Sequence, residues 1–370
     1  MTEQKLSVHA VILAGGRGTR FWPRSRTRIP KQLLTIVGKT SMLEQTVARL
    51  RPLIPPRRIW SVTNAEQAAA LRKQLPALAR QHVLAEPVGK NTAAAIALAA
   101  IHIRRAGRGD ALMAVLPADH FIRNPERYRE IVKDALTFAS EPGRIVVLGI
   151  SPTHPETGYG YVERTGETLT IHGRSVFAVR RFAEKPALPL AKEYVASGNY
   201  HWNAGMFFWR VSTYLDALKE FLPQSSAALE ELAGHIGKPS YESQLKRIYP
   251  RLENISVDYA VLERATRTAG APRVFVIPAE IGWSDVGSWA AVYELQAKRP
   301  GENIYSGPGY ALDAEGNFFW APGKVVAAIG VHDLIVVETP DALLICPRSR
   351  AQDVGKIVKE LEARNQKSLF

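Results

Sequence analysis

Short apolar runs alternate with segments of helical periodicity through the first 150 residues of the chain. The apolar runs are continuous, which is typical of strands buried on both faces of a parallel sheet. The helical segments repeat apolar residues every three to four positions, as expected of helices that cover such a sheet. The expected strands are residues 8–13, 58–62, 82–85, 112–116 and 145–148, and the expected helices are residues 42–50, 66–75, 92–105 and 126–139.

This alternation of strand and helix predicts an α/β fold with a Rossmann-like, doubly wound and mostly parallel sheet. Asn64 and Asn91 stand where helix N-caps belong, and Ser41 with Glu44 forms a capping-box pattern before the helix at 42–50. Ligands of such folds bind beyond the carboxyl ends of the strands. The segments that directly follow the strands are therefore expected to converge on one crevice.

The pattern loosens after Gly149 into shorter strands and helices, and a break at Pro300-Gly301 opens a region of short β-type runs. Gly, Pro and Asp turns separate these runs. We predict an α/β domain over residues 1–300 and a small β-rich domain with a closing helix over residues 301–370. The elements expected here are a helical stretch at 215–248, a strand at 273–277, β-type runs at 324–330 and 334–338, and the closing helix at 351–363.

A glycine-rich segment follows the first expected strand. Gly15, Gly16 and Gly18 let the chain turn sharply and bring bare backbone N–H groups against an anion. Six cationic side chains stand within the fifteen residues from Arg17 to Lys31, with no acid among them. Guanidinium and ammonium groups suit phosphate oxygens, so the segment predicts a site for a highly charged nucleotide. The cations are Arg17, Arg20, Arg24, Arg26, Arg28 and Lys31, and the nucleotide-binding positions are Ala14, Gly15, Gly16, Gly18 and Thr19.

Two commoner phosphate-binding motifs do not fit this segment. The dinucleotide fingerprint requires a third glycine three residues after Gly18, where the chain has Phe21. A Walker loop requires a glycine five residues before Gly38-Lys39-Thr40, where the chain has Leu33. An ordinary tight turn between strand and helix remains the alternative, and the arginines together with Pro30-Lys31-Gln32 argue against it.

Further blocks along the chain accompany the segment at residues 12–32. They are EPVGKNTA at 86–93, LPADH at 116–120, TGYGY at 157–161, FAEKP at 182–186, WNAGM at 202–206, SVDYA at 256–260 and GWSDVGSW at 282–289. In this order they resemble the sugar-1-phosphate nucleotidyltransferases, and among them the bacterial mannose-1-phosphate guanylyltransferases (GDP-mannose pyrophosphorylases). The resemblance covers roughly the first 290 residues.

This resemblance implies a fold of the nucleotide-diphospho-sugar transferase type with a small β-helix-like C-terminal domain. Such a domain is often involved in subunit contacts, so a homodimer is an expected assembly, although the sequence leaves the oligomeric state open. Some relatives carry a fused phosphomannose isomerase domain further on. The sequence ends before any such domain, and we expect no isomerase activity.

The resemblance also implies a reaction, in which GTP and α-D-mannose 1-phosphate give GDP-mannose and diphosphate. A sugar phosphate oxygen attacks the α-phosphorus in line without a covalent intermediate, so catalysis consists of positioning and charge neutralisation. Because two anionic reactants repel, we expect a divalent cation, Mg²⁺ or alternatively Mn²⁺, held by Asp119 and Asp285. Taken singly, each aspartate is more commonly a turn or cap residue, and its place in a matching block is what assigns it. Lys31 is expected to contact the phosphates, and Arg20 to hold the leaving diphosphate.

The expected substrate residues fall into two sets. A carboxylate accepts hydrogen bonds from the adjacent N–H groups of guanine, a donor pair that adenine lacks. A strand-end role for Glu86 and a simple N-cap role for Asn91 stay open. Tyr161 and Trp202 are expected either to flank the pocket or to lie in the core, and Asp258 and Trp283 to support it. The nucleotide set adds Glu86, Asn91 and Thr92, and the sugar-phosphate set is Gly160, Glu184, Lys185 and Asn203.

Composition favours a soluble cytoplasmic enzyme. Cys346 is the single cysteine, which excludes an intramolecular disulfide and fits a reducing compartment. Neither a signal peptide nor a membrane span is visible in the sequence. The net charge of +13 comes without aromatic-basic interleaving or a helix-turn-helix signature, so neither nucleic acid nor a membrane is expected as a partner.

Two other functions remain to be weighed. One is a related transferase that uses another base or hexose, which a panel of triphosphates and hexose 1-phosphates would distinguish. The other is a nucleotide-sugar-binding regulator without turnover. Such a regulator would be expected to lack Lys31, Asp119 or Asp285, and all three residues are present.

Overall fold

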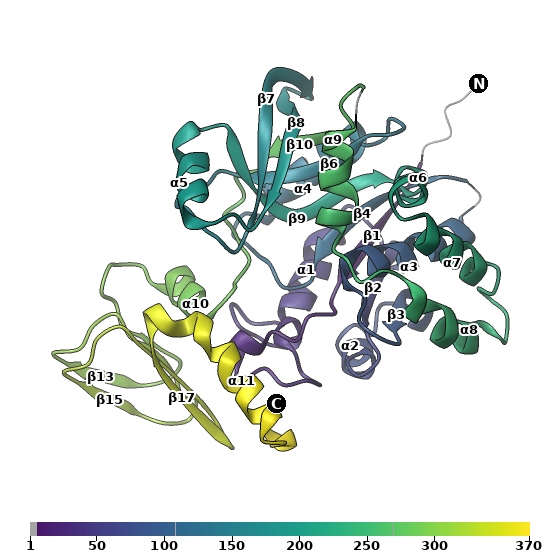
Figure 1. Ribbon diagram of the computed structural model, residues 1–370. Coiled ribbons are helices and arrows are strands. Elements are labelled where there is room, and N and C mark those ends of the chain that lie inside the picture. The colour runs from purple at the N-terminus through teal and green to yellow at the C-terminus, as the bar shows by residue number, and fades with distance from the viewer. Residues whose placement is uncertain (1–5, 108, 269) are drawn as a thin grey trace.

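The computed structural model describes residues 6–107, 109–268 and 270–370, which form a large sheet covered by helices and a smaller β-rich module (Figure 1). The nine strands of the large sheet have the order β3-β2-β1-β4-β9-β6-β10-β8-β7. No helix in these described ranges is both long enough and apolar enough to cross a membrane.

The first half of the sheet confirms the expected alternation of strand and helix. Strands β1 to β4 pair in parallel, and their apolar side chains are almost completely buried. The predicted capping box is also present, since the Ser41 and Glu44 side chains each accept a hydrogen bond from the other residue's backbone N–H. The elements are β1 (Ser7–Leu13), α1 (Met42–Leu50), β2 (Ile59–Asn64), α2 (Ala68–Gln74), β3 (Val83–Glu86), α3 (Asn91–Ala106), β4 (Ala111–Pro117), α4 (Pro125–Phe138) and β6 (Ile145–Ile150).

The second half of the sheet is mixed, and its strands are longer than the pattern indicates. Strand β9 (Tyr200–Arg210) runs antiparallel between β4 and β6, while β10 (Val274–Pro278) is parallel to β6. Strands β7 (Gly160–Ile171) and β8 (Arg174–Glu184) form a hairpin of 12 and 11 residues. The prediction of shorter strands was wrong because the outer half of β7 is solvent-exposed and carries no apolar run.

Two very short strands bring distant residues to the carboxyl end of β4. Strand β5 (Phe121–Ile122) pairs with β11 (Trp283–Ser284), with Trp283 opposite Ile122. This pairing fixes the residues after Trp283 beside those that precede Phe121. Residues 119 and 285, far apart in the sequence, thereby reach the same edge of the sheet.

The expected helical stretch at 215–248 is three helices, because Pro223 begins a new helix and the turn through Gly237 separates the next one. A π-helical turn, Asp258–Leu262, precedes α9. The helices outside the first half of the sheet are α5 (Leu188–Ser197), α6 (Val211–Phe221), α7 (Pro223–Ala233), α8 (Tyr241–Ile248), α9 (Glu263–Arg267) and α10 (Trp289–Gln296).

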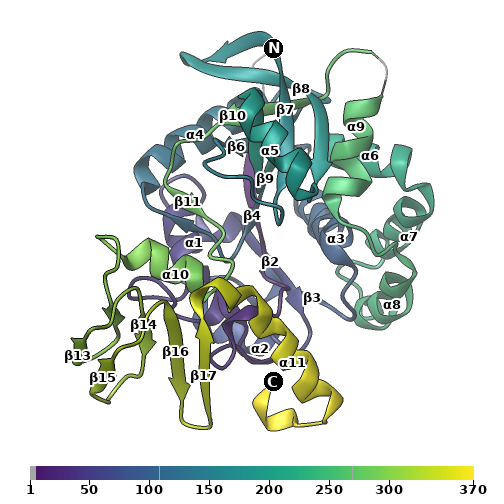
Figure 2. The ribbon, with the colours of Figure 1, turned by 60° about the vertical axis from the view of Figure 1, so that its left-hand side comes forward.

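The C-terminal module is β-helix-like, as expected. Strands β12, β14 and β16 pair in parallel on one face, β13 pairs in parallel with β15 on another, and β17 closes the first face in antiparallel pairing. A helix, α11, follows a 3-10 turn and lies against the N-terminal part of the chain (Figure 2). The elements are β12 (Ile304–Tyr305), β13 (Gly309–Leu312), β14 (Phe318–Trp320), β15 (Val326–Ile329), β16 (Leu334–Thr339), β17 (Ala342–Pro347) and α11 (Val354–Ala363).

The module shares a hydrophobic core with the segment that follows the glycine loop. Phe21 and Trp289 are almost completely buried and lie 5.1 Å apart between ring centroids, and Trp289 in turn stacks on Phe318. Val354 and Val358 of α11 join the same core. The glycine-loop region is therefore packed against the C-terminal module as well as against the sheet.

Candidate active site

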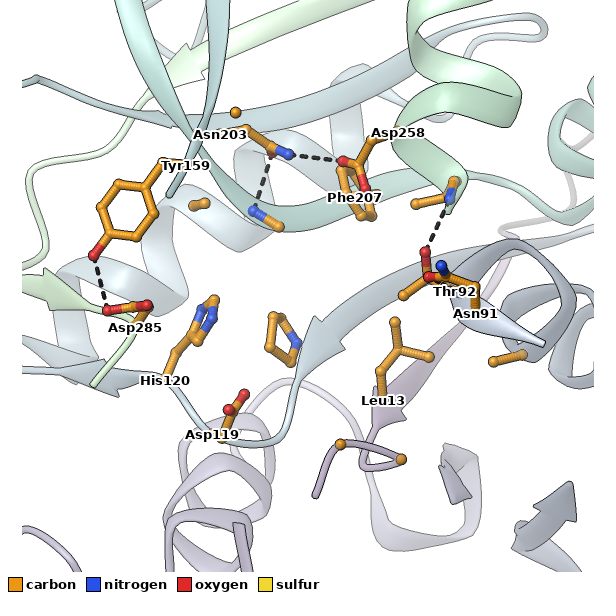
Figure 3. A pocket seen from close by; sticks show the side chains of 18 of the residues that line it. Leu13, Asn91, Thr92, Asp119, His120, Tyr159, Asn203, Phe207, Asp258 and Asp285 are labelled. Atoms are coloured by element: carbon orange, nitrogen blue, oxygen red, sulfur yellow. Dashed lines mark hydrogen bonds between the residues drawn. The ribbon is translucent and has the colours of Figure 1, made fainter. Parts of the chain in front are cut away.

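A cavity of about 530 Å³ opens at the carboxyl ends of β1, β3 and β4. Residues from nine separate stretches of the chain line it, and Figure 3 shows Asp119, His120 and Asp285 toward one side and Asn91 and Thr92 toward the other. The expected convergence of the post-strand segments on one crevice is thus observed. The sequence-predicted residues that line it are Gly15, Gly16, Glu86, Asn91, Thr92, Asp119, Gly160, Glu184, Lys185, Asn203 and Asp285.

The glycine loop offers bare backbone to this cavity. A Cβ atom added at Gly16 would meet no atom within 4 Å, so a ligand can approach the backbone closely there. The Gln32 side chain holds the loop by donating to the carbonyls of Ala14 at 2.7 Å and Gly16 at 3.0 Å. Gln32 was quoted in the sequence pattern, but its role as a loop anchor was not foreseen.

Gly18 has a different task from its neighbours. Its φ of 62° lies in the left-handed region, and an added Cβ would lie 2.4 Å from the Cβ of Lys31. The absence of a side chain at Gly18 therefore lets Lys31 pack against the loop. Gly18 itself does not line the cavity. Ala14, Gly18, Thr19 and Lys31 are outside the cavity lining, and their contact with a nucleotide stays a prediction.

Most arginines of the segment contact the C-terminal module instead of the cavity. Arg20 donates to the Gln352 side chain at 2.7 Å and does not line the cavity, so its role at the diphosphate also stays a prediction. The residues that these arginines contact lie more than 290 positions away in the sequence. The local sequence pattern therefore showed unpaired cations, which suggested phosphate binding. The contacts are Arg17 with Glu362, Arg20 with Gln352, Arg26 with Asp341, and Arg24 over the ring of Trp320.

Lys31 joins the two aspartates. Its buried Nζ donates to Asp119 Oδ2 at 2.8 Å and to the backbone carbonyl of Asp285 at 2.6 Å. Burial would by itself raise the pKa of Asp119, but Lys31 and His120 beside it bring that pKa below its usual range. The carboxylate is therefore held in its charged form at the cavity.

The turn that follows β11 aims the Asp285 carboxylate. Tyr159 donates its hydroxyl to Asp285 Oδ1 at 2.8 Å (Figure 3). Gly287 makes room for the same carboxylate, since an added Cβ would lie 2.7 Å from Oδ2. Tyr159 was missed at the sequence level. Tyr161, the tyrosine considered in the sequence, is completely buried in the core, whereas Tyr159 precedes β7 and lines the cavity.

His120 is a second cavity residue that the sequence pattern did not single out. The indole N–H of Trp283 donates to His120 Nδ1 at 3.0 Å, and burial lowers the pKa of His120. An indole nitrogen only donates, so Nδ1 accepts and the neutral ring carries its proton on Nε2. Trp283 thus supports the pocket, as expected, by fixing this ring.

The side of the cavity where we expect the nucleotide is formed by Glu86 at the end of β3 and by the start of α3. Burial raises the pKa of Glu86, whose carboxylate accepts a hydrogen bond of 2.6 Å from Tyr249. The N-cap prediction for Asn91 was wrong. Lys90 precedes α3, and Asn91 has a φ of 64° with its side chain accepting from the N–H of Thr92.

The side of the cavity where we expect the sugar phosphate contains a group of polar side chains around Glu184. Gly160 lies opposite Glu184 in the β7–β8 pairing, and an added Cβ would lie 2.5 Å from the Glu184 carboxylate. Lys185 Nζ lies 3.1 Å from the same carboxylate. The Asn203 amide donates to Asp258 at 2.9 Å, and burial together with Glu184 raises the pKa of Asp258 to about 6. Gly160 therefore makes room for the Glu184 carboxylate. The sequence had suggested instead that Gly160 makes room for a ligand.

Known proteins identify this arrangement. The profile of the nucleotidyl transferase family matches residues 9–300, and that of the MannoseP isomerase/GMP-like beta-helix domain matches residues 310–361. Mannose-1-phosphate guanylyltransferase ManC of Salmonella typhimurium is 39% identical over 98% of this chain and 75% of its own length. The mannose-1-phosphate guanylyltransferase of Klebsiella pneumoniae is 41% identical over 97% of this chain and 75% of its own length.

A solved structure agrees with these relatives. The mannose-1-phosphate geranyltransferase from Thermus thermophilus superposes with a TM-score of 0.85 at 35% identity, covering 96% of this chain and 100% of that one. The chain belongs to the mannose-1-phosphate guanylyltransferase family of nucleotidyl transferases. The family resemblance found in the sequence and the expected fold class are both confirmed, and the chain is a nucleotidyltransferase enzyme.

The donor atoms at Lys31 fit what a nucleotidyltransferase needs for a hard divalent cation. The Asp119 carboxylate and the Asp285 carbonyl already surround one positive charge, that of the Lys31 ammonium. Within the described ranges, no group of three or more His, Cys, Asp or Glu side chains could hold a metal. A pair of carboxylates is nevertheless sufficient for Mg²⁺, which takes its other ligands from water and substrate phosphates.

Proposed function

We propose that the chain transfers GMP from GTP to α-D-mannose 1-phosphate, giving GDP-mannose and diphosphate. The observation that carries the proposal is the joint placement of three features around one cavity. These features are the open backbone at Gly16, the Lys31 ammonium between Asp119 and Asp285, and the carboxylate of Glu184. They supply a triphosphate cradle, charge neutralisation and a hydroxyl-binding group, respectively.

The reaction follows from this placement. An oxygen of the sugar phosphate forms a bond to the α-phosphorus of GTP, and the bond from that phosphorus to the bridging oxygen of the diphosphate breaks. Lys31 stabilises negative charge that spreads over the phosphate oxygens, and the loop backbone orients them. No residue of the protein needs to form a covalent bond to substrate.

We further propose that Asp119 and Asp285 hold Mg²⁺, with Mn²⁺ as the alternative. The donor set is hard and anionic, as both ions prefer. Bound there, the cation neutralises triphosphate charge that two carboxylates alone would repel. Lys31 remains as the protein's own cation, and it keeps Asp119 ionised.

Diphosphate release measured with each of the four common ribonucleoside triphosphates, with mannose 1-phosphate and with glucose 1-phosphate, tests the function. We expect the highest kcat/KM with GTP and mannose 1-phosphate. A higher value with another base or hexose would identify a different transferase of the same fold. Binding of nucleotide sugars without any diphosphate release would instead support a regulator.

Glu184→Ala is expected to raise the KM for mannose 1-phosphate by about tenfold or more, with the binding of GTP little changed. The reason is that Glu184 lies on the sugar side of the cavity, where a carboxylate accepts from hydroxyl groups. Initial-rate kinetics and calorimetry with GTP measure the two effects. Glu163→Ala is a suitable control, since this β7 carboxylate bonds Tyr200 and does not line the cavity. An equal loss of GTP affinity would contradict the placement of Glu184.

A homodimer formed through the C-terminal module is the assembly that we propose. Tyr310, Leu312 and Ile329 are 71%, 60% and 69% exposed, and Leu312 lies opposite Ile329 in the β13–β15 pairing. A second copy of this flat apolar face would cover these side chains. We expect light scattering to give a dimer for the unaltered chain and a monomer for Ile329→Glu. A monomeric unaltered chain would contradict the proposal.

A cytoplasmic location, in which GTP is available and the single Cys346 stays reduced, completes the proposal. Fractionation of cells that express the chain tests this location directly.

A further inference from the structure

Tyr249 connects the helical region after β9 to the nucleotide side of the cavity. It lies in the 3-10 turn Tyr249–Arg251, directly after α8, and is completely buried. Its hydroxyl donates to Glu86 Oε1 at 2.6 Å across 163 residues of sequence. Tyr249 does not itself line the cavity, so it acts on a ligand only through Glu86.

The Glu86 carboxylate has a defined orientation because of this bond. Its second oxygen, Oε2, faces Gly15, where an added Cβ would lie 3.4 Å away, and both residues line the cavity. The side chain is only 6% exposed. With Oε1 occupied by Tyr249, Oε2 is the acceptor on the side of the glycine loop.

We propose that Tyr249 is a positioning residue for nucleobase selection, which holds the Glu86 carboxylate so that it accepts from the Watson–Crick edge of guanine. This inference rests on the proposed function. Guanine presents adjacent N–H groups on that edge, whereas adenine presents a ring nitrogen acceptor that a carboxylate repels. The sequence pattern does not single out Tyr249.

The charge of Glu86 gives the physical reason. Burial raises the pKa of Glu86, and the Tyr249 hydroxyl opposes that rise. Without the hydroxyl, a buried carboxylate oxygen has lost its donor and the protonated form becomes more favourable. A protonated carboxyl carries a donor of its own and can pair with adenine, so the preference for guanine must fall.

Tyr249→Phe tests the proposal, and Tyr214→Phe is its matched control. Both tyrosines are completely buried, and both substitutions remove one hydroxyl that donates a hydrogen bond. The Tyr214 hydroxyl, however, donates to the backbone carbonyl of Ala93 at 2.8 Å and not to a cavity carboxylate. The readout is the ratio of kcat/KM for GTP to that for ATP, together with the KM for mannose 1-phosphate and the Tm.

We expect Tyr249→Phe to lower the GTP-to-ATP ratio by about 10- to 100-fold, the range for losing a hydrogen bond to a charged group. The KM for mannose 1-phosphate should stay within twofold of its original value, and Tyr214→Phe should keep the full ratio. An unchanged ratio in a folded Tyr249→Phe variant overturns the inference, as does an equal fall in Tyr214→Phe. If the unaltered chain shows no preference for GTP, the proposed function fails instead.

Glu86→Gln completes a double-mutant cycle and covers the case in which Tyr249→Phe does not fold. The amide keeps the size of the carboxylate and removes its charge. The GTP-to-ATP ratio of kcat/KM must therefore fall in the Glu86→Gln single variant, in which Tyr249 is unchanged. Combined with Glu86→Gln, the Tyr249→Phe change should lower the ratio no further. Independent and multiplying losses would show that Tyr249 does not act through Glu86.

Discussion

Asp119→Asn and Asp285→Asn are each expected to lower kcat by at least about 100-fold in the presence of Mg²⁺. Each change keeps the size of the side chain but removes a negative charge that a divalent cation needs at the triphosphate. Since both residues would serve one ion, the double variant should be little worse than either single one. Diphosphate release at saturating GTP and mannose 1-phosphate, with Mg²⁺ titrated, measures the loss.

The contacts of Lys31 separate the metal explanation from a second one. Asp119 binds the Lys31 ammonium through its side chain, whereas Asp285 binds it through the backbone carbonyl. Asp119→Asn therefore disturbs both the ion pair and the metal site, but Asp285→Asn leaves the Lys31 contacts in place. Losses that multiply in the double variant, or a normal Mg²⁺ requirement in Asp285→Asn, would rule out a shared ion. Circular dichroism checks that the turn around Asp285 persists.

Gly18→Ala is expected to lower kcat/KM by about 100-fold although residue 18 does not line the cavity. The new Cβ would lie 2.4 Å from the Lys31 Cβ and 3.0 Å from its backbone nitrogen, so Lys31 must move. A displacement of about 1 Å at a catalytic group is sufficient for a loss of this size. Steady-state kinetics measure the effect, and thermal denaturation measures the accompanying change in stability.

Gly143→Ala supplies the matched control for backbone strain. Gly143 also has a positive φ, 78°, but an added Cβ there meets no atom within 4 Å. Both variants should lose roughly 1–2 kcal/mol of folding stability from the left-handed backbone, while only Gly18→Ala should lose activity. Full activity in Gly18→Ala would mean that the position of Lys31 does not limit the reaction.

The sequence predicts the first half of the fold well because each of its signals is local. Continuous apolar runs mark strands buried on both faces, and the capping box at Ser41 is read within four residues. The hairpin of β7 and β8 was underestimated for the opposite reason. The outer half of β7 faces solvent, so no apolar run marks it.

The site is predictable where a residue type alone carries the chemistry, and not where a partner decides its role. Lys31 contacts Asp119 and Asp285, and both aspartates line the cavity. Tyr249 and Tyr159 gain their importance from partners 163 and 126 residues away. The arginines of the glycine segment were assigned to phosphate collectively, because their acidic and aromatic partners near the C-terminus are invisible in the local pattern.

The shared core of the glycine segment and the C-terminal module changes how distant mutations should be interpreted. Residues near position 21 share their core with Trp289 and also with side chains from position 318 onward, so the last part of the chain completes the packing around the glycine segment. The α/β sheet and the β-helix-like module therefore differ in architecture but share this core. A substitution of a buried α11 residue would therefore disturb the packing that supports the glycine loop, although α11 is far from the loop in sequence. We expect such a substitution to weaken nucleotide binding.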